Sequence, residues 1–231
     1  MQPNKIWILL LLSITIGVAS AQPINTVDHK ATKKTASLYF NLMEMGNNNR
    51  MLFGHQDDLA YGVDWWANEG HSDTHLTSGA YPALFGWDLG KIGEPRNLDS
   101  VSFKKMKKWI KWVYKKGGVN TISWHMINLE NKSNSWDTAL SVSSLLPGGD
   151  LHLSYLAKLD HFATFIRSCK SGFTRIPILF RPFHEHNGDW FWWGKESCSK
   201  EEYIALWKFT VDYLKDQKKL HNLLYVYSPD A

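Results

Sequence analysis

The chain has 231 residues, of which 44% are hydrophobic and 21% are charged, enough apolar content for a buried core. This composition excludes a disordered or fibrous protein. The formal net charge is +4, and because the lysines are spread along predicted helices instead of gathered in one block, the chain gives little reason to expect nucleic acid as a partner.

The first 21 residues have the pattern of a secretory signal peptide. Lys5 supplies the positive charge, residues 6–16 the apolar stretch, and the small residues 19–21 a cleavage site. The apolar stretch is too short, and too interrupted by Ser13 and Thr15, for stable insertion into a membrane. We therefore expect cleavage after Ala21 and a secreted or periplasmic mature protein, whose residues 22–231 form one domain.

Helical and extended patterns alternate along the mature chain. Strands are predicted at 51–53, 82–87, 119–123, 176–180 and 222–227, and helices at 26–45, 102–116, 155–169 and 199–219. Ser199 and Glu202 have the spacing of a capping box at the start of the last helix. No glycine-rich nucleotide motif follows any strand, so the alternation favours a (β/α)8 TIM barrel. Such a barrel needs eight strands, and with about five present we expect the front part of a longer, C-terminally truncated domain.

Polar residues follow several predicted strands where the chain leaves the sheet. His55 and Asp57 follow the first strand, and we expect them either to touch a ligand or to brace a loop. His125 and Asn128 follow the third, and we expect both to bind substrate. The next segment, 129–149, is a long polar loop that contains Trp136, and loops of that length are usually functional or mobile.

The stretch 176–194 holds the largest group of side chains suited to catalysis or ligand binding. A short apolar run ends in Arg181, and Glu185 then lies among imidazoles, an amide and indoles: His184, His186, Asn187, Trp190, Trp192 and Trp193. Each residue type has an ordinary explanation, since a lone Glu is usually a solvated charge, a His is often a core residue, and about half of the twelve tryptophans should simply pack in the core. A carboxylate beside large apolar rings is nevertheless costly unless function requires it.

Glycoside hydrolysis needs a carboxylic acid that protonates the leaving oxygen and a second carboxylate that attacks carbon or activates water. Glu185 suits the first role, because apolar surroundings favour the protonated form of a carboxyl group. His184 and His125 would bind sugar hydroxyls, and Trp190 would offer a flat face for a sugar ring. None of this chemistry requires a metal or a cofactor.

Several motifs then resemble glycoside hydrolase family 26 in the expected order. Along the chain they are residues 53–58 (FGHQDD), 86–88 (GWD), 123–125 (SWH) with Asn128, 181–194 (RPFHEHNGDWFWWG) and 225–230 (YVYSPD). The run 181–194 is the most specific of them. The resemblance implies a retaining mechanism on a (β/α)8 barrel, and its commonest activity is cleavage of internal β-1,4 bonds in mannan. It assigns Glu185 as the acid/base, His184 and Trp190 to the cleavage subsite, His125 to the glycone side and Trp136 to the leaving-group side.

The chain departs from that family at three points. His186 stands where many members carry Met, and Leu129 replaces a common Pro. The family nucleophile is a Glu after the seventh strand, and we assign that role to none of Glu130, Glu196 and Glu201. We therefore expect only the acid/base half of the site here, and little or no turnover by this chain.

Several alternatives stay open on the sequence. Related enzymes cleave β-1,3-xylan or mixed-linkage glucan, and a carbohydrate-binding protein without activity would also use its tryptophans. His184 and His186 share one face of an extended strand, which would suit a metal. Pairing of Cys169 with Cys198 is likewise undecided, as are endo or exo attack and the oligomeric state.

Overall fold

The computed structural model describes residues 26–139 and 141–230, so the predicted signal peptide lies outside the described residues. Five strands form one sheet in the order β1-β4-β5-β8-β9, and all their pairings are parallel. The strands are β1 Gly54–Gln56, β4 Leu84–Asp88, β5 Val119–Ser123, β8 Ile178–Arg181 and β9 Leu223–Tyr225. Their spatial order follows the chain, as in a (β/α)8 barrel. The predicted fold class, an incomplete barrel of this type, is confirmed.

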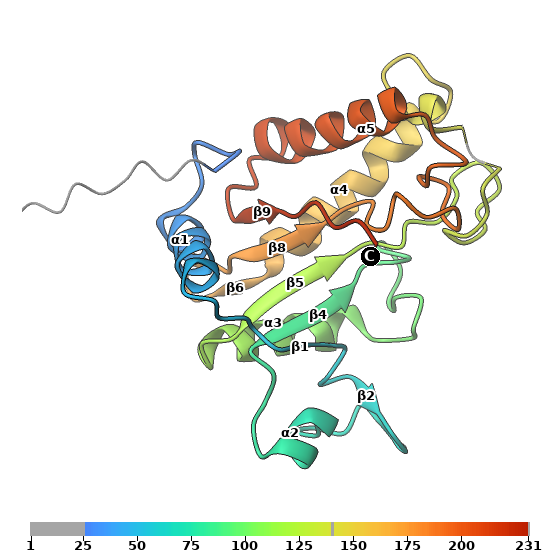
Figure 1. The fold of residues 1–231 in the computed structure, drawn as a ribbon. Helices are drawn as coiled ribbons and strands as arrows, with labels where there is room; N and C mark the ends of the chain where they lie inside the picture. The colour runs from blue at the N-terminus through green and yellow to red at the C-terminus, as the bar shows by residue number, and fades with distance from the viewer. Residues whose placement is uncertain (1–25, 140, 231) are drawn as a thin grey trace, which may run out of the picture.

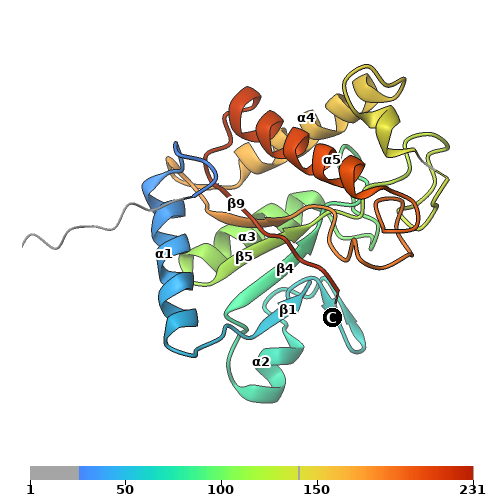
Figure 2. The ribbon, with the colours of Figure 1, turned by 45° about the horizontal axis from the view of Figure 1, so that its top comes forward.

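Five α-helices accompany this sheet in the described part of the chain. They are α1 Lys33–Asn47, α2 Asp73–Ser78, α3 Phe103–Lys115, α4 His152–Ser168 and α5 Lys200–Asp212, the last continuing as a π-helical turn through Tyr213–Gln217. Figure 1 shows α3, α4 and α5 along the sheet, and α1 near the end from which the strand arrows start. Figure 2 shows the connecting loops gathered at the opposite end, beyond the arrowheads, where residues that follow the strands meet.

The amphipathic helices formed where their patterns predicted them. In α3 the buried residues Phe103, Met106, Ile110 and Val113 recur at intervals of three or four, with lysines on the solvent side. In α5 the predicted capping box is complete, because Ser199 accepts from the Glu202 amide and the Glu202 carboxylate accepts from the Ser199 amide. Both elements therefore begin within one residue of the predicted position.

Two predictions at the N-terminal side were wrong. The apolar run 51–53 is not a strand: Met51 is 90% and Phe53 is 63% exposed, and the strand is the polar segment that follows them. Gly54–Gln56 is an edge of the described sheet, where backbone pairing with β4 needs no buried side chains. The first helix begins at Lys33 and not near residue 26, because Thr32 caps it by accepting from the Thr35 amide.

The sequence did not predict the short elements, and it left the pairing of the two cysteines undecided. The segments Tyr61–Gly62 and Trp65–Trp66 pair as the hairpin β2–β3, Lys170–Ser171 and Thr174–Arg175 as the hairpin β6–β7, and Val142–Leu145 forms the 3₁₀ turn η1. Cys169 and Cys198 are both buried and free, and burial raises the pKa of each thiol to about 12. The possible disulfide between them is therefore absent from the structure. No helix within 26–139 and 141–230 is long and apolar enough to cross a membrane.

Candidate active site

The carboxylate of Glu185 lies just beyond the carboxyl end of β8. The chain turns there through left-handed backbone at Phe183 (φ 47°) and Glu185 (φ 55°), a conformation that is uncommon for residues other than glycine. Two contacts hold this turn: the Glu185 amide donates to the Ser228 carbonyl at 2.7 Å, and the Tyr203 hydroxyl donates to the Phe183 carbonyl at 3.0 Å. The loop after β9 therefore helps to position Glu185.

Trp190 is the immediate neighbour of that carboxylate. Its indole Nε1 donates to Glu185 Oε2 at 3.1 Å, and both side chains are half-buried. Gly188 makes room for this ring, since a Cβ at that position would lie 2.4 Å from the indole. The predicted proximity of Glu185 and Trp190 is thus present, with the carboxylate fixed at a partly open surface.

The other two indoles of the cluster belong to the core. Trp192 and Trp193 are 0% and 1% exposed. Trp192 Nε1 donates to the Met126 carbonyl at 3.0 Å, and Trp193 Nε1 donates to the His184 carbonyl at 2.8 Å. They hold the loops after β5 and β8 together, so their large apolar surfaces are used for packing.

Three side chains from three successive strands form a hydrogen-bonded chain beside Glu185. Asp88, the last residue of β4, is 2% exposed, and its Oδ2 lies 2.8 Å from His125 Nδ1. His125 Nε2 lies 3.2 Å from His184 Nε2. The residues meet because the carboxyl ends of parallel neighbouring strands lie at one edge of a sheet.

The pKa shifts of Asp88, His125 and His184 indicate which imidazole holds the proton between the two histidines. Burial would raise the pKa of Asp88, but hydrogen bonds from His125, Gly90 and Ser123 hold it below its ordinary value. Burial would likewise lower the pKa of His125, yet the contact with Asp88 raises it. The pKa of His184 falls to about 4 through burial and the nearby positive charges of His125 and Arg181. The raised pKa of His125 and the lowered pKa of His184 therefore favour His125 as the donor and His184 as the acceptor in this contact.

Aromatic rings cover this imidazole pair. Trp136 stacks on His125 with ring centroids 5.4 Å apart and planes 14° apart, and it stays 51% exposed. Phe191 meets His125 edge-on at 5.3 Å and His184 at 5.4 Å. Trp136 and Trp190 thus leave indole surface accessible near a half-buried His125 and a buried His184, an arrangement suited to flat sugar rings.

Asn128 lies behind that surface instead of on it. The side chain is fully buried, its Nδ2 donates to the Asp137 carbonyl at 3.2 Å, and its Oδ1 accepts from the Glu130 amide at 2.8 Å. Asp137 in turn accepts from Asn131 and Ser133, which holds the loop that carries Trp136. In this structure Asn128 braces the loop, and its contact with substrate stays a prediction.

His55, which lies within β1, and Asp57, which follows it directly, were expected to touch a ligand or to brace a loop. His55 Nδ1 lies 2.9 Å from Asp58 Oδ1, which also accepts from Thr74 at 2.7 Å. Asp57 is fully buried, and burial, together with the negative charges of Asp99 and Asp88, raises its pKa to about 7. Of the two roles considered for His55 and Asp57, the structure supports loop bracing.

The histidine pair considered for a metal does not converge. His184 faces His125, whereas His186 stacks on Tyr203 at 4.4 Å and its Nε2 lies 2.8 Å from the Tyr227 hydroxyl. Within the part of the chain that the structure describes, no three His, Cys, Asp or Glu residues gather where they could hold a metal ion. The prediction that His184 and His186 share one face was wrong because both lie in the turns and bends of residues 182–189 after β8. The alternation of faces holds only within an extended strand.

Sequence reasoning missed Asp88 and Phe191 as members of this site. Asp88 had a usable signal, because an acidic residue that closes a buried strand needs a partner. Phe191 had none, since one ring among several aromatic residues has no distinguishing pattern. The predicted residues Glu185, His184, His125, Trp190 and Trp136 do gather at one edge of the sheet.

A parallel β/α sheet with a carboxylate, an imidazole pair and exposed indoles at its carboxyl edge defines a barrel glycosidase type of site. A family model for glycosyl hydrolase family 26 matches residues 27–231. The chain belongs to glycosyl hydrolase family 26. The predicted family resemblance is thereby confirmed.

Sequence relatives agree with this assignment. The chain is 37% identical over 223 residues to a mannan endo-1,4-beta-mannosidase of Bifidobacterium adolescentis, an alignment that covers 92% of this chain and 22% of that protein. It is 29% identical to a mannan endo-1,4-beta-mannosidase of Bacillus subtilis, covering 97% of this chain and 64% of that protein. The chain therefore spans less than two thirds of the length of these relatives.

Solved structures show the same relation. A family 26 beta-mannanase from Bacteroides ovatus is 42% identical with a TM-score of 0.83, and the match covers 86% of this chain and 58% of that one. A modular endo-beta-1,4-mannanase from Cellulomonas fimi is 36% identical with a TM-score of 0.83, covering 89% of this chain and 48% of that one. The chain is thus similar to about half of each solved chain.

Proposed function

We propose that the protein hydrolyses internal β-1,4-mannosidic bonds in mannan by a retaining mechanism, with Glu185 as the acid/base. The observation that carries this proposal is the Glu185 carboxyl group, fixed by Trp190 beside the His125–His184 pair at the carboxyl edge of the sheet. Mannan is the substrate in the names of the curated relatives.

The mechanism assigns two jobs to Glu185. In the first step its carboxyl proton passes to the glycosidic oxygen while a second carboxylate attacks the anomeric carbon. In the second step Glu185 takes a proton from water while the water oxygen bonds to the anomeric carbon. The bond from that carbon to the second carboxylate breaks, and this carboxylate is released as an anion. The Nε1–H of Trp190 keeps the carboxyl group oriented between these steps.

The imidazole pair supports the same site in different protonation states. The contact with Asp88 raises the pKa of His125 and so favours its charged form, whereas burial lowers the pKa of His184, which is next to Glu185 in the chain, to about 4. His184 therefore stays neutral near neutral pH. Trp136 and Trp190 provide the surfaces on which mannose rings would stack.

The test uses the protein expressed from its complete gene with mannohexaose as substrate. Glu185→Gln should lower kcat/KM by about 10³-fold, since general acid catalysis is removed. On an aryl mannoside with a good leaving group the same variant should lose far less in the first step, because that departure needs no proton. Glu196→Gln, an exposed residue in a turn, is the matched control and should keep wild-type activity.

Other outcomes separate the remaining candidates. Full activity of Glu185→Gln on mannohexaose would refute the assigned role. Faster cleavage of β-1,3-xylan or mixed-linkage glucan would change the substrate, and mannan binding without any hydrolysis would favour a carbohydrate-binding protein. Retention of the β configuration in the first product, read by NMR, checks the retaining mechanism.

Two further proposals concern the chain itself. Glu130 lies in a loop, Glu196 in a turn and Glu201 at the start of α5, all exposed, and we assign the nucleophile to none of them. The purified 231-residue polypeptide should therefore turn over mannan barely above background, and activity that Glu185→Gln abolishes would refute this. Export with cleavage after Ala21 is checked by N-terminal sequencing of the secreted protein.

A further inference from the structure

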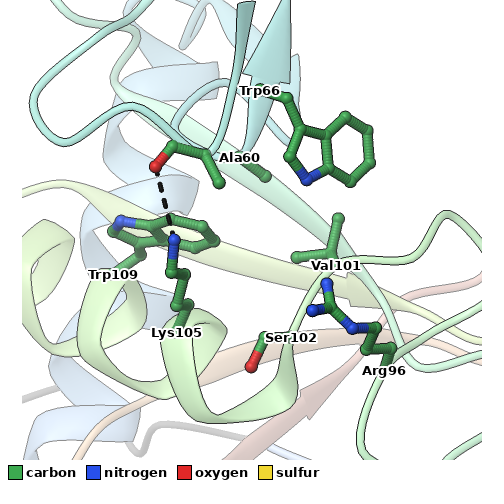
Figure 3. Close-up of a pocket in the computed structure, with 8 residues that line it drawn as sticks. Ala60, Trp66, Arg96, Val101, Ser102, Lys105 and Trp109 are labelled. Atoms are coloured by element: carbon green, nitrogen blue, oxygen red, sulfur yellow. Dashed lines mark hydrogen bonds between the residues drawn. The ribbon is translucent and has the colours of Figure 1, made fainter.

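A cavity of about 240 Å³ lies apart from Glu185, between the β2–β3 hairpin and the start of α3. Figure 3 shows its walls: Trp66 comes from the hairpin and Trp109 from α3, and the side chains of Arg96 and Lys105 project at its edge. None of its lining residues belongs to the group around Glu185. The cavity therefore needs an explanation of its own.

Both indole walls are held in place by other rings. Tyr61 stacks on Trp66 with centroids 5.1 Å apart and planes 6° apart, and Trp66 remains 48% exposed. Trp109 stacks on the buried Trp87 at 6.0 Å and 7°. Preformed aromatic surfaces of this kind lower the entropy cost of binding a flat ligand.

The loop that carries Arg96 is also fixed. Residues Arg96 and Ser102 pair as an antiparallel bridge, and the Asn97 side chain accepts from the amides of Asp99 and Val101 at 3.0 and 2.8 Å. Arg96 Nη1 donates to the Ser100 carbonyl at 2.9 Å, which leaves its other N–H groups free. A preorganised guanidinium loses little freedom when it binds a planar anion.

The lining offers hydrogen-bond donors and few acceptors. Lys105 donates to the Ala67 carbonyl at 3.3 Å and keeps two further N–H groups, and Figure 3 shows the indole nitrogen of Trp66 at the edge of the ring nearest Val101. Ser102 is the one lining side chain with an acceptor oxygen, and no Asp or Glu lines the cavity. The hydroxyl groups of a neutral sugar need acceptors as well as donors, whereas a carboxylate only accepts.

We propose that this cavity binds a uronic acid unit of a polysaccharide. The pyranose ring lies against the two indoles, and the carboxylate accepts from Arg96 and Lys105 as charge-assisted hydrogen bonds. The volume is below the ~300–1,000 Å³ typical of drug-sized sites, which suits one sugar ring and not a longer segment. The site is independent of hydrolysis and of the assignment of Glu185.

The test measures binding of methyl β-D-glucuronide to the 231-residue chain, with methyl β-D-glucoside as the neutral comparison. Indole N–H signals in NMR spectra, assigned with Trp66→Phe and Trp109→Phe, identify the rings that the ligand touches. The Trp66 and Trp109 signals should shift saturably with the glucuronide, and the glucoside should bind about tenfold or more weakly.

Two charge variants complete the experiment. Arg96→Gln should raise the Kd for the glucuronide about tenfold while far-UV circular dichroism stays unchanged. Lys104→Gln removes an exposed positive charge from the same helix without touching the cavity, and its Kd should stay within about twofold of wild type. Equal affinity for the two ligands, an unchanged Kd in Arg96→Gln, or shifts confined to Trp136 and Trp190 would each overturn the proposal.

Discussion

Replacing Asp88 by Asn removes a buried negative charge at the end of β4 and keeps the size of the side chain. Asp88 Oδ2 accepts from Ser123 Oγ at 2.9 Å and from the amide and Nδ1 of His125 at 3.2 and 2.8 Å, and Oδ1 accepts from the Gly90 amide at 2.6 Å. One amide oxygen has two lone pairs and cannot serve all these donors. At least one buried donor then stays unpaired beside an uncompensated imidazolium, so we expect a loss of about 3 kcal/mol in the free energy of unfolding.

The pH dependence follows from the two pKa shifts. The pKa of His125 is raised above 6.5 in the fold, so its contribution to stability is complete below 6.5 and is lost as pH rises through the folded value. The pKa of Asp88 is lowered below 3.8, so its contribution is complete above 3.8 and is lost as pH falls through the folded value. Urea unfolding should therefore show the largest difference between wild type and Asp88→Asn between pH 4 and 6.5.

An NMR titration of His125 reads the same interaction directly. In Asp88→Asn the midpoint should move down, because burial then acts on the imidazole without the compensating carboxylate. Asp28→Asn is the matched control: Asp28 lies 2.8 Å from His221 Nδ1, with the same side-chain exposures of 3% and 22% as the Asp88–His125 pair. It should destabilise the fold and leave the His125 titration unmoved. A midpoint that stays or rises in Asp88→Asn would refute the reasoning.

Two further substitutions test other buried contacts. Asp57 keeps its proton up to about pH 7 when folded and releases it near 3.8 when unfolded, so wild-type stability falls across that interval. Asp57→Asn should be more stable than wild type by about 2–4 kcal/mol at pH 8 and about equal at pH 4 in urea unfolding. Gly188→Ala places a Cβ 2.4 Å from the Trp190 ring and should displace that indole from Glu185, seen as a large shift of its N–H signal. Gly46→Ala, with nothing within 4 Å, is its control and should leave the spectrum unchanged.

Each of these two expectations has a contrary outcome. If Asp57→Asn is less stable than wild type at pH 8, the ionised Asp57 carboxylate does not destabilise the folded protein. If the Trp190 N–H signal stays in place in Gly188→Ala, the backbone of the loop after β8 has moved to make room for the Cβ and the indole has not.

The sequence by itself determined the order of the elements and the residue types at the strand ends. Apolar runs of four or five residues predicted the central strands, since a strand covered on both faces must be apolar throughout. The heptad-like spacing in α3 and the capping box at Ser199 are local signals, so they were read correctly. The sequence did not predict the edge strand β1, because its polar residues are held by backbone pairing, which leaves no pattern in the side chains.

Only the tertiary structure decided which of those residues meet. Asp88, His125 and His184 are separated by 37 and 59 positions along the chain, and the alignment of parallel strands brings them into hydrogen-bond distance. The fold also brings His186 to Tyr227, buries Asn128 behind its loop and leaves Cys169 and Cys198 as free thiols. Residue types are a property of the sequence, whereas distances and burial, which set the pKa values and the contacts, exist only in the folded chain.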